Sequence, residues 1–529
     1  GPAGKTYSGL WTWALGMSKA TKHKGAAWLF IQWATCPRTL LNATVEHRNY
    51  NPTRISVMND PRTQTVLGSW GKGAYVQTVQ ENLKTARVAW VPAAGLACVL
   101  VSLACVGKSG TLFWGSYQVD PLSQYFKAAV ALGFAIATLN ARIQPTLDSR
   151  RVSDYFLLLA LCCFGLMVLS SAVELVTVYL ALEISSYPLY AVIPLRGQDR
   201  QAAEAGIKYI LFGAAATAVS LFGLSLIIAG HNTTYLQELA GRPWSFAEAP
   251  LGVVGLAMFL AGFLYKLALF PFHFWCPDLY EGASNETAAF AATLPKLGAV
   301  VALVRLASLL KPGLEITTLL ALLAAASMLY GNLAGLVQKD VKRLLGYSSV
   351  SHAGYVILGF VSGTPQGLAA AAFYSLVYVL MNLTAFWVVS SVSVDGRNVA
   401  LEDLRGLHKR SPALAFTLAV AAFSLVGLPP TAGFIGKLFL LTSAWGHGYN
   451  WLVVWGCVNT AIAIFYYLNL VRYAYTSDAA PADLPELPAA FRPRSLAWAG
   501  VLSATILLLG IYPNPIFQWT LVAGTRLLQ

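Results

Sequence analysis

Charged side chains are scarce in this sequence: Asp, Glu, Lys and Arg make up 11% of it, against 57% hydrophobic residues. This scarcity excludes a soluble globular protein and an intrinsically disordered chain, because both need many more charges. The apolar runs are about 20 residues long, which suits membrane helices rather than the roughly ten-residue alternating strands of a membrane barrel. We therefore predict an all-α polytopic membrane protein.

Cysteine is also sparse and lacks the spacing of a metal site. The seven cysteines form no CxxC pair, and most lie inside apolar runs. Structural zinc sites and iron-sulfur clusters need several thiolates in close spacing. The sequence therefore predicts no metal site and no redox centre in this chain.

Acidic residues are nearly missing from the first part of the chain. Residues 1–87 contain 11 Lys or Arg against three acids, and their longest apolar run, 25–36, is too short to span a membrane. Such a basic, acid-poor composition resembles a mitochondrial presequence or its remainder, although a solvated extension without a function is an equal alternative. We predict a basic N-terminal extension over 1–87, a transmembrane domain over 88–513 and a C-terminal tail over 514–529.

The transmembrane domain contains apolar runs for about 13 helices with short connections. Their expected bounds are 88–107, 122–141, 153–171, 172–195, 205–230, 250–276, 286–310, 314–337, 343–361, 366–394, 411–445, 449–471 and 495–513.

Basic residues are distributed unequally between the two sets of loops. The loops after even-numbered spans hold 15 Lys and Arg in addition to the extension's 11, whereas the opposite loops hold four. Loops with the excess remain inside, so the N-terminus is predicted inside and the C-terminus outside. Membrane orientation thus explains the net charge of +13 without a nucleic-acid partner.

Four ionisable residues fall near the middle of predicted spans: Glu183, Lys266, Lys296 and Lys437. A lysine at bilayer depth costs about 2.5–3.5 kcal/mol on insertion scales, so such residues are functional candidates. A desolvated lysine can release its proton, whereas arginine stays charged, and a nearby carboxylate favours the charged lysine. We predict a proton-translocation axis in which Glu183 controls Lys266; a static salt bridge is the alternative.

Further polar groups at other depths are possible relay members: Lys208, His273, Tyr347, Ser348 and His352. His352 lies one helical turn from Ser348, which favours a joint role. For a single membrane histidine, an ordinary hydrogen-bonded helix contact is the alternative. Lys208 and Arg305 lie closer to span ends, where long side chains usually extend to the interface.

Prolines accompany two of the lysines and predict broken helices. Pro271 follows Lys266, and Pro429 with Pro430 precedes Lys437, and each proline removes a backbone donor. The two lysines are 437 − 266 = 171 residues and five spans apart, and 183 + 171 = 354 lies two positions from His352. An odd number of spans reverses direction in the membrane, so the pattern indicates inverted repeats around a transport pathway.

Several long motifs resemble the antiporter-like membrane subunits of respiratory complex I. They are YLALEISSYPLYAVIPLRG, FLYKLALFPFHFWCPDLYEGA, VKRLLGYSSVSHAGY and GLPPTAGFIGKLFLL. The resemblance covers about residues 88–513 and is best to the N-type subunits, because of the PDLYEGA form and of lysine at 296 and 437.

The resemblance implies two inverted five-helix repeats, each with a broken helix, and redox-driven proton pumping. It assigns modulation of Lys266 to Glu183, connection of two half-channels to Lys296, and the end of the path to Lys437. This chain would bind no cofactor; NADH, FMN, iron-sulfur clusters and ubiquinone would belong mainly to other subunits. Its partners would be other complex I subunits, especially neighbouring antiporter-like ones, and membrane lipids.

One departure from the family pattern follows the first broken helix. The family usually reads EGAPTPV, whereas this chain has Ser284, Asn285, Glu286 and Thr287 after EGA, which puts the geometry leading to Lys296 in doubt.

The basic N-terminus favours the mitochondrial inner membrane with the N-terminus in the matrix. A bacterial plasma membrane or a plastid is the alternative location. The alternative function is a subunit of a multisubunit cation/proton antiporter.

Overall fold

The computed structural model describes residues 61–62, 91–141, 146–148, 151–196, 199–310, 315–476 and 494–528. The predictions for the N-terminal extension therefore lie outside the described residues, apart from 61–62. Backbone contacts divide the chain between Trp90 and Val91, three residues beyond the predicted end of the extension. The following description concerns the second unit.

Helices dominate this unit, and their order follows the predicted order of apolar runs. An apolar helix, Val91–Ala104, comes first. The longer α-helices that follow are α6 Pro121–Asn140, α7 Val152–Ser171, α8 Leu175–Val192, α9 Arg200–His231, α11 Pro250–Leu267, α12 Trp275–Gly282, α13 Asn285–Leu306, α14 Glu315–Leu336, α15 Val341–Val361, α16 Pro365–Val392, α18 Pro412–Val426, α19 Ala432–Ala444, α20 Asn450–Tyr475, α21 Arg494–Ile511 and α22 Asn514–Leu528.

Short elements occupy the connections between these helices. They are the 3-10 turns η3 Ile193–Leu195, η4 Ala307–Leu309 and η5 Leu401–Leu404, the helices α10 Leu236–Ala240 and α17 Leu407–Arg410, and the antiparallel strands β1 Gly110–Leu112 and β2 Tyr117–Val119.

Helix starts follow capping residues and prolines in the sequence. Asp120 and Ser123 form a capping box at α6, and Asp199, Ser284 and Asp340 accept backbone N–H groups at α9, α13 and α15. Helices α6, α11, α16 and α18 begin with proline, whose missing N–H would have had no partner there.

The number of membrane-length helices is smaller than the predicted 13. Ten helices in the described part of the chain are long and apolar enough to span, or eleven if the bent pair α21–α22 is one span. The helix Val91–Ala104 has only 14 residues, about 21 Å at 1.5 Å per residue, against a hydrocarbon core of about 30 Å. The predicted span 411–445 is divided into α18 and α19.

Two helices are interrupted beside the lysines. Helix α11 ends at Leu267, earlier than the expected 276, and α12 starts at Trp275, so Pro271 lies within the interruption. Between α18 and α19, residues 427–431 are not helical and contain Pro429 and Pro430. Both interruptions therefore lie where a proline removes a backbone donor.

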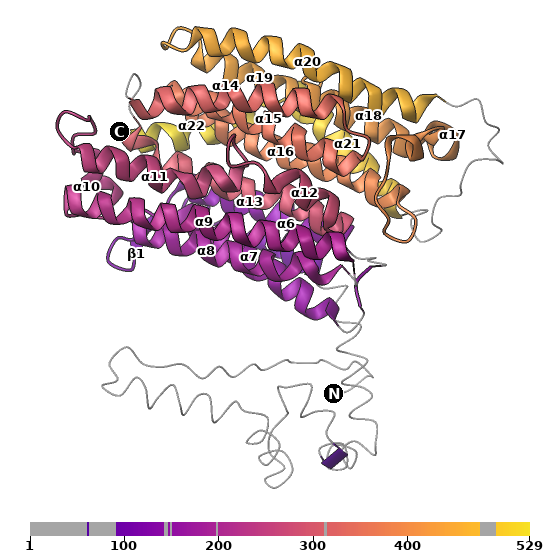
Figure 1. The fold of residues 1–529 in the computed structure, drawn as a ribbon, viewed down its shortest axis with the longest axis horizontal. Helices are drawn as coiled ribbons and strands as arrows, with labels where there is room; N and C mark the ends of the chain where they lie inside the picture. Colours follow the sequence, from indigo (N-terminus) through magenta and orange to yellow (C-terminus); the bar gives the residue numbers. More distant parts are fainter. Residues whose placement is uncertain are drawn as a thin grey trace. The chain divides into compact units, whose positions relative to one another are not determined.

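The centre of the bundle is formed by α13 and α16 (Figure 1). Every residue in the most apolar 18-residue window of these two helices is buried, against 33% in α9. Helices α7, α8 and α9 lie on one side of this centre, and α14, α19 and α20 lie on the other. The deepest positions available to a functional side chain are thus on α13, α15 and α16.

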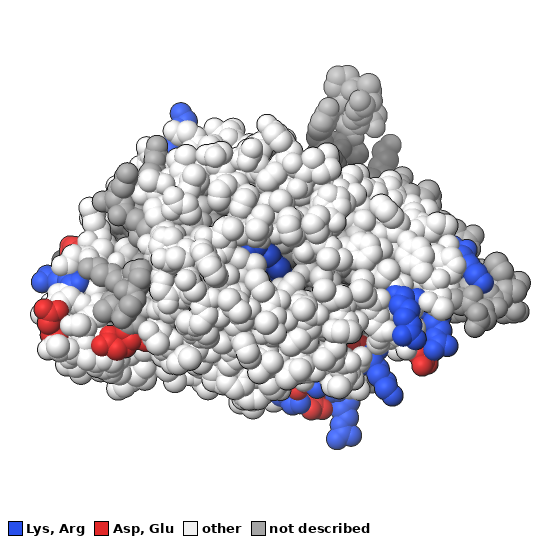
Figure 2. Space-filling view, turned by 90° about the horizontal axis from the view of Figure 1, so that it is seen from above, with Lys and Arg blue, Asp and Glu red and all other residues white. Residues whose placement is uncertain are grey.

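Loops of the same end of the bundle are tied to one another. Isolated β-bridges join Tyr117 to Ala172 and Glu174 to Tyr235 at one end, and Asp340 to Ala400 at the other. Figure 2 shows charged side chains gathered mainly towards the ends and one edge of the visible face, with a wide, mostly white area between them that is interrupted by blue atoms near its centre. This distribution matches helices that cross an apolar layer.

The segment 514–529, predicted as a tail, forms helix α22 as far as Leu528 and is bent 67° from α21. Phe517 packs on Phe439 with ring centroids 4.1 Å apart, and the indole of Trp519 donates to the carbonyl of Pro121 at 3.2 Å. A helix packed on α6 and α19 is thus part of the bundle. Its signal in the sequence was short because Pro513 and Asn514 interrupt the apolar run.

Candidate functional site

Lys266 lies in the last turn of α11, directly before the interruption. Its side chain is 2% exposed, and its ammonium donates to the Tyr209 hydroxyl at 3.4 Å, with the Tyr209 ring centroid at 5.9 Å. Ala268 ends the helix in a left-handed conformation, φ 62°. The free carbonyls at a helix C-terminus carry partial negative charge, so this end of α11 is a favourable place for a cation.

Glu183 lies on α8 and is 6% exposed. Among the described ion pairs, none joins its carboxylate to Lys266, although the two groups interact electrostatically. Tyr187, one turn along α8, interacts with the same carboxylate. The carboxylate and ammonium are therefore near each other without contact, which argues against the static salt bridge.

Lys296 lies on the fully buried helix α13 and is 3% exposed. Its ammonium donates to the Ser349 hydroxyl and to the Cys276 thiol, the latter at 3.7 Å. The rings of Trp275 and Tyr280 lie at 6.0 and 5.8 Å from it. Both rings belong to α12, so the short helix after the interruption forms one wall around Lys296.

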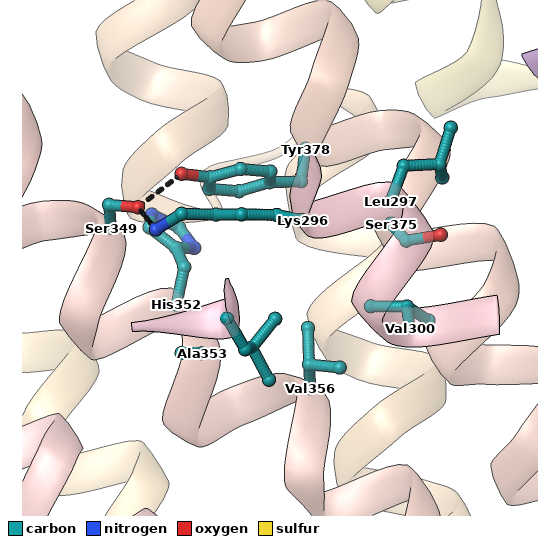
Figure 3. A pocket seen from close by; sticks show the side chains of 10 residues that line it. Lys296, Leu297, Val300, Ser349, His352, Ala353, Val356, Ser375 and Tyr378 are labelled. Atoms are coloured by element: carbon teal, nitrogen blue, oxygen red, sulfur yellow. Dashed lines mark hydrogen bonds between the residues drawn. The ribbon is translucent and has the colours of Figure 1, made fainter. Parts of the chain in front are cut away.

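A small cavity adjoins the Lys296 ammonium (Figure 3). Lys296 and Tyr378 both point to Ser349, and the Tyr378 and Ser349 hydroxyls are 2.6 Å apart. His352 lies beside this group on the same helix as Ser349. The remaining lining is mostly apolar: Leu267, Leu297, Val300, Ala353, Val356 and Ser375.

His352 continues the polar network towards the second half of the chain. Its Nδ1 is 2.6 Å from the Tyr374 hydroxyl, and its Nε2 is 3.0 Å from the Tyr467 hydroxyl. Tyr467 also hydrogen-bonds the Ser348 hydroxyl. Tyr467 therefore links Ser348 to His352, the two residues for which the sequence predicts a joint role. A histidine with a hydroxyl on each nitrogen can accept a proton on one side and donate one on the other.

Lys437 is 4% exposed and lies on α19, directly after the second interruption. Its ammonium donates to the carbonyls of Leu425 at 3.2 Å and Val426 at 2.9 Å, which end α18. The Tyr355 ring centroid is 4.5 Å away. Lys437 thus lies at a helix C-terminus, as Lys266 does.

Aromatic side chains connect the three lysines. Trp275 packs on Tyr209 at 4.8 Å between ring centroids, so this pair separates Lys266 from Lys296. His352 interacts electrostatically with both Lys296 and Lys437 and stands between them. The structure therefore brings Lys296, Ser348, His352 and Lys437 into one hydroxyl-rich region, with Lys266 and Glu183 beyond the aromatic pair.

Three other relay candidates lie away from this region. Lys208 makes ion pairs with Glu204 and Asp278, each at 2.8 Å, and is 39% exposed. His273 packs among rings, with the Tyr330 centroid at 4.5 Å, and no described hydrogen bond joins it to a lysine of the axis. Tyr347 lies beside Arg343, whose guanidinium is 5.8 Å from the ring centroid.

Arg305 was expected to extend to the interface, and this is wrong. It is 2% exposed and donates two hydrogen bonds to the Asp120 carboxylate, at 2.6 and 2.8 Å, and two to the Ser170 carbonyl. Burial alone would raise the pKa of Asp120, but Arg305 and Ser123 outweigh it and hold the pKa below its ordinary value. Sequence position indicated a span end but not a carboxylate 185 residues earlier.

Sequence reasoning missed the partners of the lysines, of His352 and of Ser349. Tyr209 and Cys276 accept hydrogen bonds from lysines, and the Tyr355 ring lies against Lys437. Tyr374 and Tyr467 bind His352, and Tyr378 binds Ser349. The spacing of Tyr374 and Tyr378, four residues apart in an apolar run, was the available signal, because it places both on one helix face. In the described part of the chain, no group of three or more His, Cys, Asp or Glu could hold a metal ion.

The arrangement is similar to proteins of known class. The profile of the family described as "NADH:quinone oxidoreductase/Mrp antiporter, TM" matches residues 172–463. A relative named NADH-quinone oxidoreductase subunit N 2, from Solidesulfovibrio magneticus, is 58% identical over 86% of this chain and 96% of its own length. One from Opitutus terrae with the same name is 48% identical over 85% of this chain and 94% of its own length.

Solved structures show the same similarity. A chain of respiratory complex I from Thermus thermophilus is 34% identical, with a TM-score of 0.72 over 84% of this chain and 96% of that one. A chain of the Mrp complex from Dietzia has a TM-score of 0.74 at 20% identity, over 86% of this chain and 95% of that chain. At that identity, the second likeness concerns the fold alone.

Proposed function

Because the chain belongs to the NADH:quinone oxidoreductase/Mrp antiporter transmembrane family, as an N-type antiporter-like subunit, we propose that it translocates protons in the membrane arm of complex I. The observation that carries the proposal is the series of buried lysines with neutral partners. A lysine bound only by hydroxyls, a thiol and carbonyls can lose its proton without leaving a carboxylate unpaired.

In this mechanism Lys266, Lys296, His352 and Lys437 hold and pass protons along the bundle. Glu183 lies close enough to Lys266 to favour its charged form and far enough to be uncoupled by a small movement of α8 or α11. The Ser349, Tyr378, Tyr374 and Tyr467 hydroxyls pass a proton by accepting one hydrogen bond while donating another.

The proposal includes two inverted five-helix repeats. Shifting residue numbers by 171 places α8, α9, α13 and α14 over α15, α16, α20 and α21 in order, and α11, at 421–438 after the shift, over parts of both α18 and α19. Lys266 then coincides with Lys437, and each half has an interrupted helix at the same place in the order, although the interruption 268–274 shifts to 439–445, beyond the interruption at 427–431. This correspondence supports thirteen membrane-crossing elements, with Val91–Ala104 as a short one and α18–α19 as a broken one.

The chain acts in this proposal as a non-redox subunit of an NADH:quinone oxidoreductase. NADH, FMN, iron-sulfur clusters and ubiquinone are placed in other subunits, and neighbouring antiporter-like subunits are its partners. The matching relatives are bacterial, so the expected mitochondrial location receives no support from them. We place this multi-pass protein in a bacterial cytoplasmic membrane with its basic loops on the cytoplasmic side.

Lys266→Met tests this function in the whole complex, reconstituted into vesicles. Methionine fills similar space without a titratable group, so we expect fewer protons moved per NADH oxidised while the complex stays assembled. Lys108→Met, in an exposed loop, is the matched control and should pump as the unaltered complex does. An unchanged ratio of protons to NADH in Lys266→Met would show that Lys266 is not a carrier.

Purification tests the assignment to complex I against the cation/proton antiporter. The chain should co-purify with flavin and iron-sulfur subunits. A sodium-coupled assembly without these subunits would contradict the proposal.

A further inference from the structure

Loops from the basic end of the bundle converge on the segment after α12. The Arg196 guanidinium, directly after η3, donates to the carbonyls of residues 281–283 at 3.0–3.3 Å. The Lys342 ammonium, at the start of α15, donates to the Ala283 carbonyl at 2.7 Å. Arg196 also binds Asn398 and Gly396, which follow α16. We call Arg196, Ser284, Asn285, Glu286 and Lys342 the cradle.

The cradle contains a buried carboxylate with two buried cations near it. Glu286 is 4% exposed, Lys342 is 0% exposed and Arg196 is 9% exposed. Neither cation makes a described ion pair with Glu286, although both interact with it electrostatically. Burial favours a neutral carboxyl and the cations favour a carboxylate, so small changes in hydration decide which form is present.

Asn285 provides an independent observation that the cradle takes a polar ligand. The residue is 1% exposed, and both polar atoms of its side chain are buried without a protein partner in the described structure. Buried amides are nearly always hydrogen-bonded, and a buried water is the usual partner where the protein offers none. An amide that can bind water beside a carboxyl is what proton entry from solvent requires.

The cradle reaches the surface on one side. Glu281 and Asn398 are both partly exposed, and the Glu281 carboxylate binds Arg343. The Asn398 amide donates to the Glu281 carbonyl at 2.8 Å, next to the carbonyls held by Arg196. The solvent-exposed part of this end of the bundle therefore begins at Glu281, five residues before Glu286 in the chain. Asp340, the cap of α15, is a further acidic group facing Lys342.

The other side of the cradle leads to Lys296. Helix α12 runs from Trp275 and Cys276, beside the Lys296 ammonium, to Gly282 at the cradle. Along α15, Lys342 and Ser349 are seven residues apart, so they lie on one helix face about 10 Å apart. The Tyr280 hydroxyl, on α12, is 3.2 Å from the Ser349 hydroxyl. Glu286 and Lys296 are ten residues apart on α13, about 15 Å along the helix axis, and Tyr280 lies on the neighbouring α12 next to Ser349, the partner of Lys296.

We propose that Glu286 loads protons from the basic side of the membrane and that Asn285 holds the water through which they enter, so that the cradle supplies Lys296. This inference rests on the proposed function. In the step, the Glu286 carboxylate accepts a proton from the water held by Asn285, and that water takes another proton from bulk solvent. The Glu286 carboxyl then gives up its proton to a chain of water and Tyr280, whose other end gives one to the neutral Lys296 amine, so that Glu286 is again a carboxylate. Each transfer breaks one O–H bond and forms one O–H or N–H bond, and no electron moves.

Glu286→Gln in the reconstituted complex tests the inference, with Lys296→Met and the double variant beside it. We expect Glu286→Gln to lower the protons moved per NADH as far as Lys296→Met does, and the double variant to show no further loss. Glu286→Asp keeps a carboxyl and should restore most of the pumping. Glu402→Gln removes an exposed carboxylate from the same end of the bundle and should have no effect.

The outcomes separate this inference from the proposed function. Normal pumping in Lys296→Met would contradict the proposed function itself. Reduced pumping in Lys296→Met with normal pumping in Glu286→Gln would overturn the inference alone. Failure of Glu286→Asp to restore pumping that Glu286→Gln lost would mean that Glu286 only shapes the start of α13. A fully additive double variant would mean that Glu286 feeds a different carrier.

Discussion

At the scale of single residues, the buried cations are of two kinds. Arg305 is bound by a carboxylate, so its charge is permanently compensated. Lys266, Lys296 and Lys437 are bound by a hydroxyl, a hydroxyl with a thiol, and carbonyls, respectively. Loss of a proton from these lysines leaves ordinary neutral hydrogen bonds, whereas removal of Asp120 would leave a buried charge alone. Only the lysines are therefore suited to exchange protons.

Asp120→Asn should destabilise the purified complex against thermal unfolding, because breaking one partner of a buried ion pair costs about 3–5 kcal/mol. Asp154→Asn, at an exposed position of the first turn of α7, is the control and should cost much less. Because the pKa of Asp120 is lowered by folding, its stabilisation is complete above about pH 4 and disappears as the pH falls below that value. Equal stability of both variants at neutral pH would show that the Asp120–Arg305 ion pair does not stabilise the fold.

At the scale of elements, two half-helices end beside lysines. Lys266 belongs to the last turn of α11, and Lys437 is bound by the last carbonyls of α18. Gly427 is left-handed, φ 91°, and ends α18, so that the last carbonyls of this helix are left for the Lys437 ammonium. A Cβ at Gly427 would lie 3.0 Å from the Lys437 side chain. The interruption therefore positions the cation as well as ending the helix.

Gly427→Ala should reduce proton pumping by displacing Lys437. Left-handed backbone costs a non-glycine residue about 1–2 kcal/mol, and the new methyl group presses on the lysine. Gly446→Ala separates the two effects, because Gly446 has φ 82° and no atom near its Cβ position. Both variants should lose similar stability, while protons per NADH fall only in Gly427→Ala. An equal effect on pumping in both would assign the loss to backbone strain.

At the scale of the whole molecule, orientation follows from charge. The connections after α8, α14 and α16 lie at one end and, with the first turn of α15, contain Arg196, Arg343 and Arg405 among other cations, whereas the α9–α11 connection lies at the opposite end. Excess basic loops remain on the cytoplasmic side in bacteria. The end that carries the cradle is therefore predicted to be the cytoplasmic side, from which we propose that protons are taken.

Single cysteines at Glu402 and Ala247, both exposed, test this orientation. In cells whose native Cys36, Cys98, Cys105 and Cys457 are replaced by serine, the native cysteines that remain are buried, and an impermeant thiol reagent should label Ala247→Cys from outside. It should reach Glu402→Cys only after the membrane is opened. Labelling of Glu402→Cys in intact cells would invert the predicted topology.

The sequence predicted what depends on local pattern. Hydropathy located the apolar runs, and the prolines located both interruptions. Glu183 and the three lysines were found because they are charged residues near the middle of predicted spans. The partners of these residues come from helices far apart in the chain: His352 meets Tyr374 and Tyr467, and Arg305 meets Asp120. The hydrophobic periodicity of a sequence does not show which distant helices meet, so these pairings could not be predicted from it. The altered turn was expected to disturb the approach to Lys296, yet Ser284 caps α13 and the helix is continuous.

Helix α9 has 32 residues, about 48 Å at 1.5 Å per residue, whereas the hydrocarbon layer is about 30 Å thick. Tilt of the helix accommodates some of this extra length, and the remaining residues lie in the headgroup region. Its first turns carry Arg200, Glu204 and Lys208, which suit that region, while its far end is the buried His231. Helix α9 thus sets the position of the bundle along the membrane normal. The headgroups of one leaflet lie at the level of Lys208, and this determines how far below that membrane surface Lys266, Lys296 and Lys437 lie.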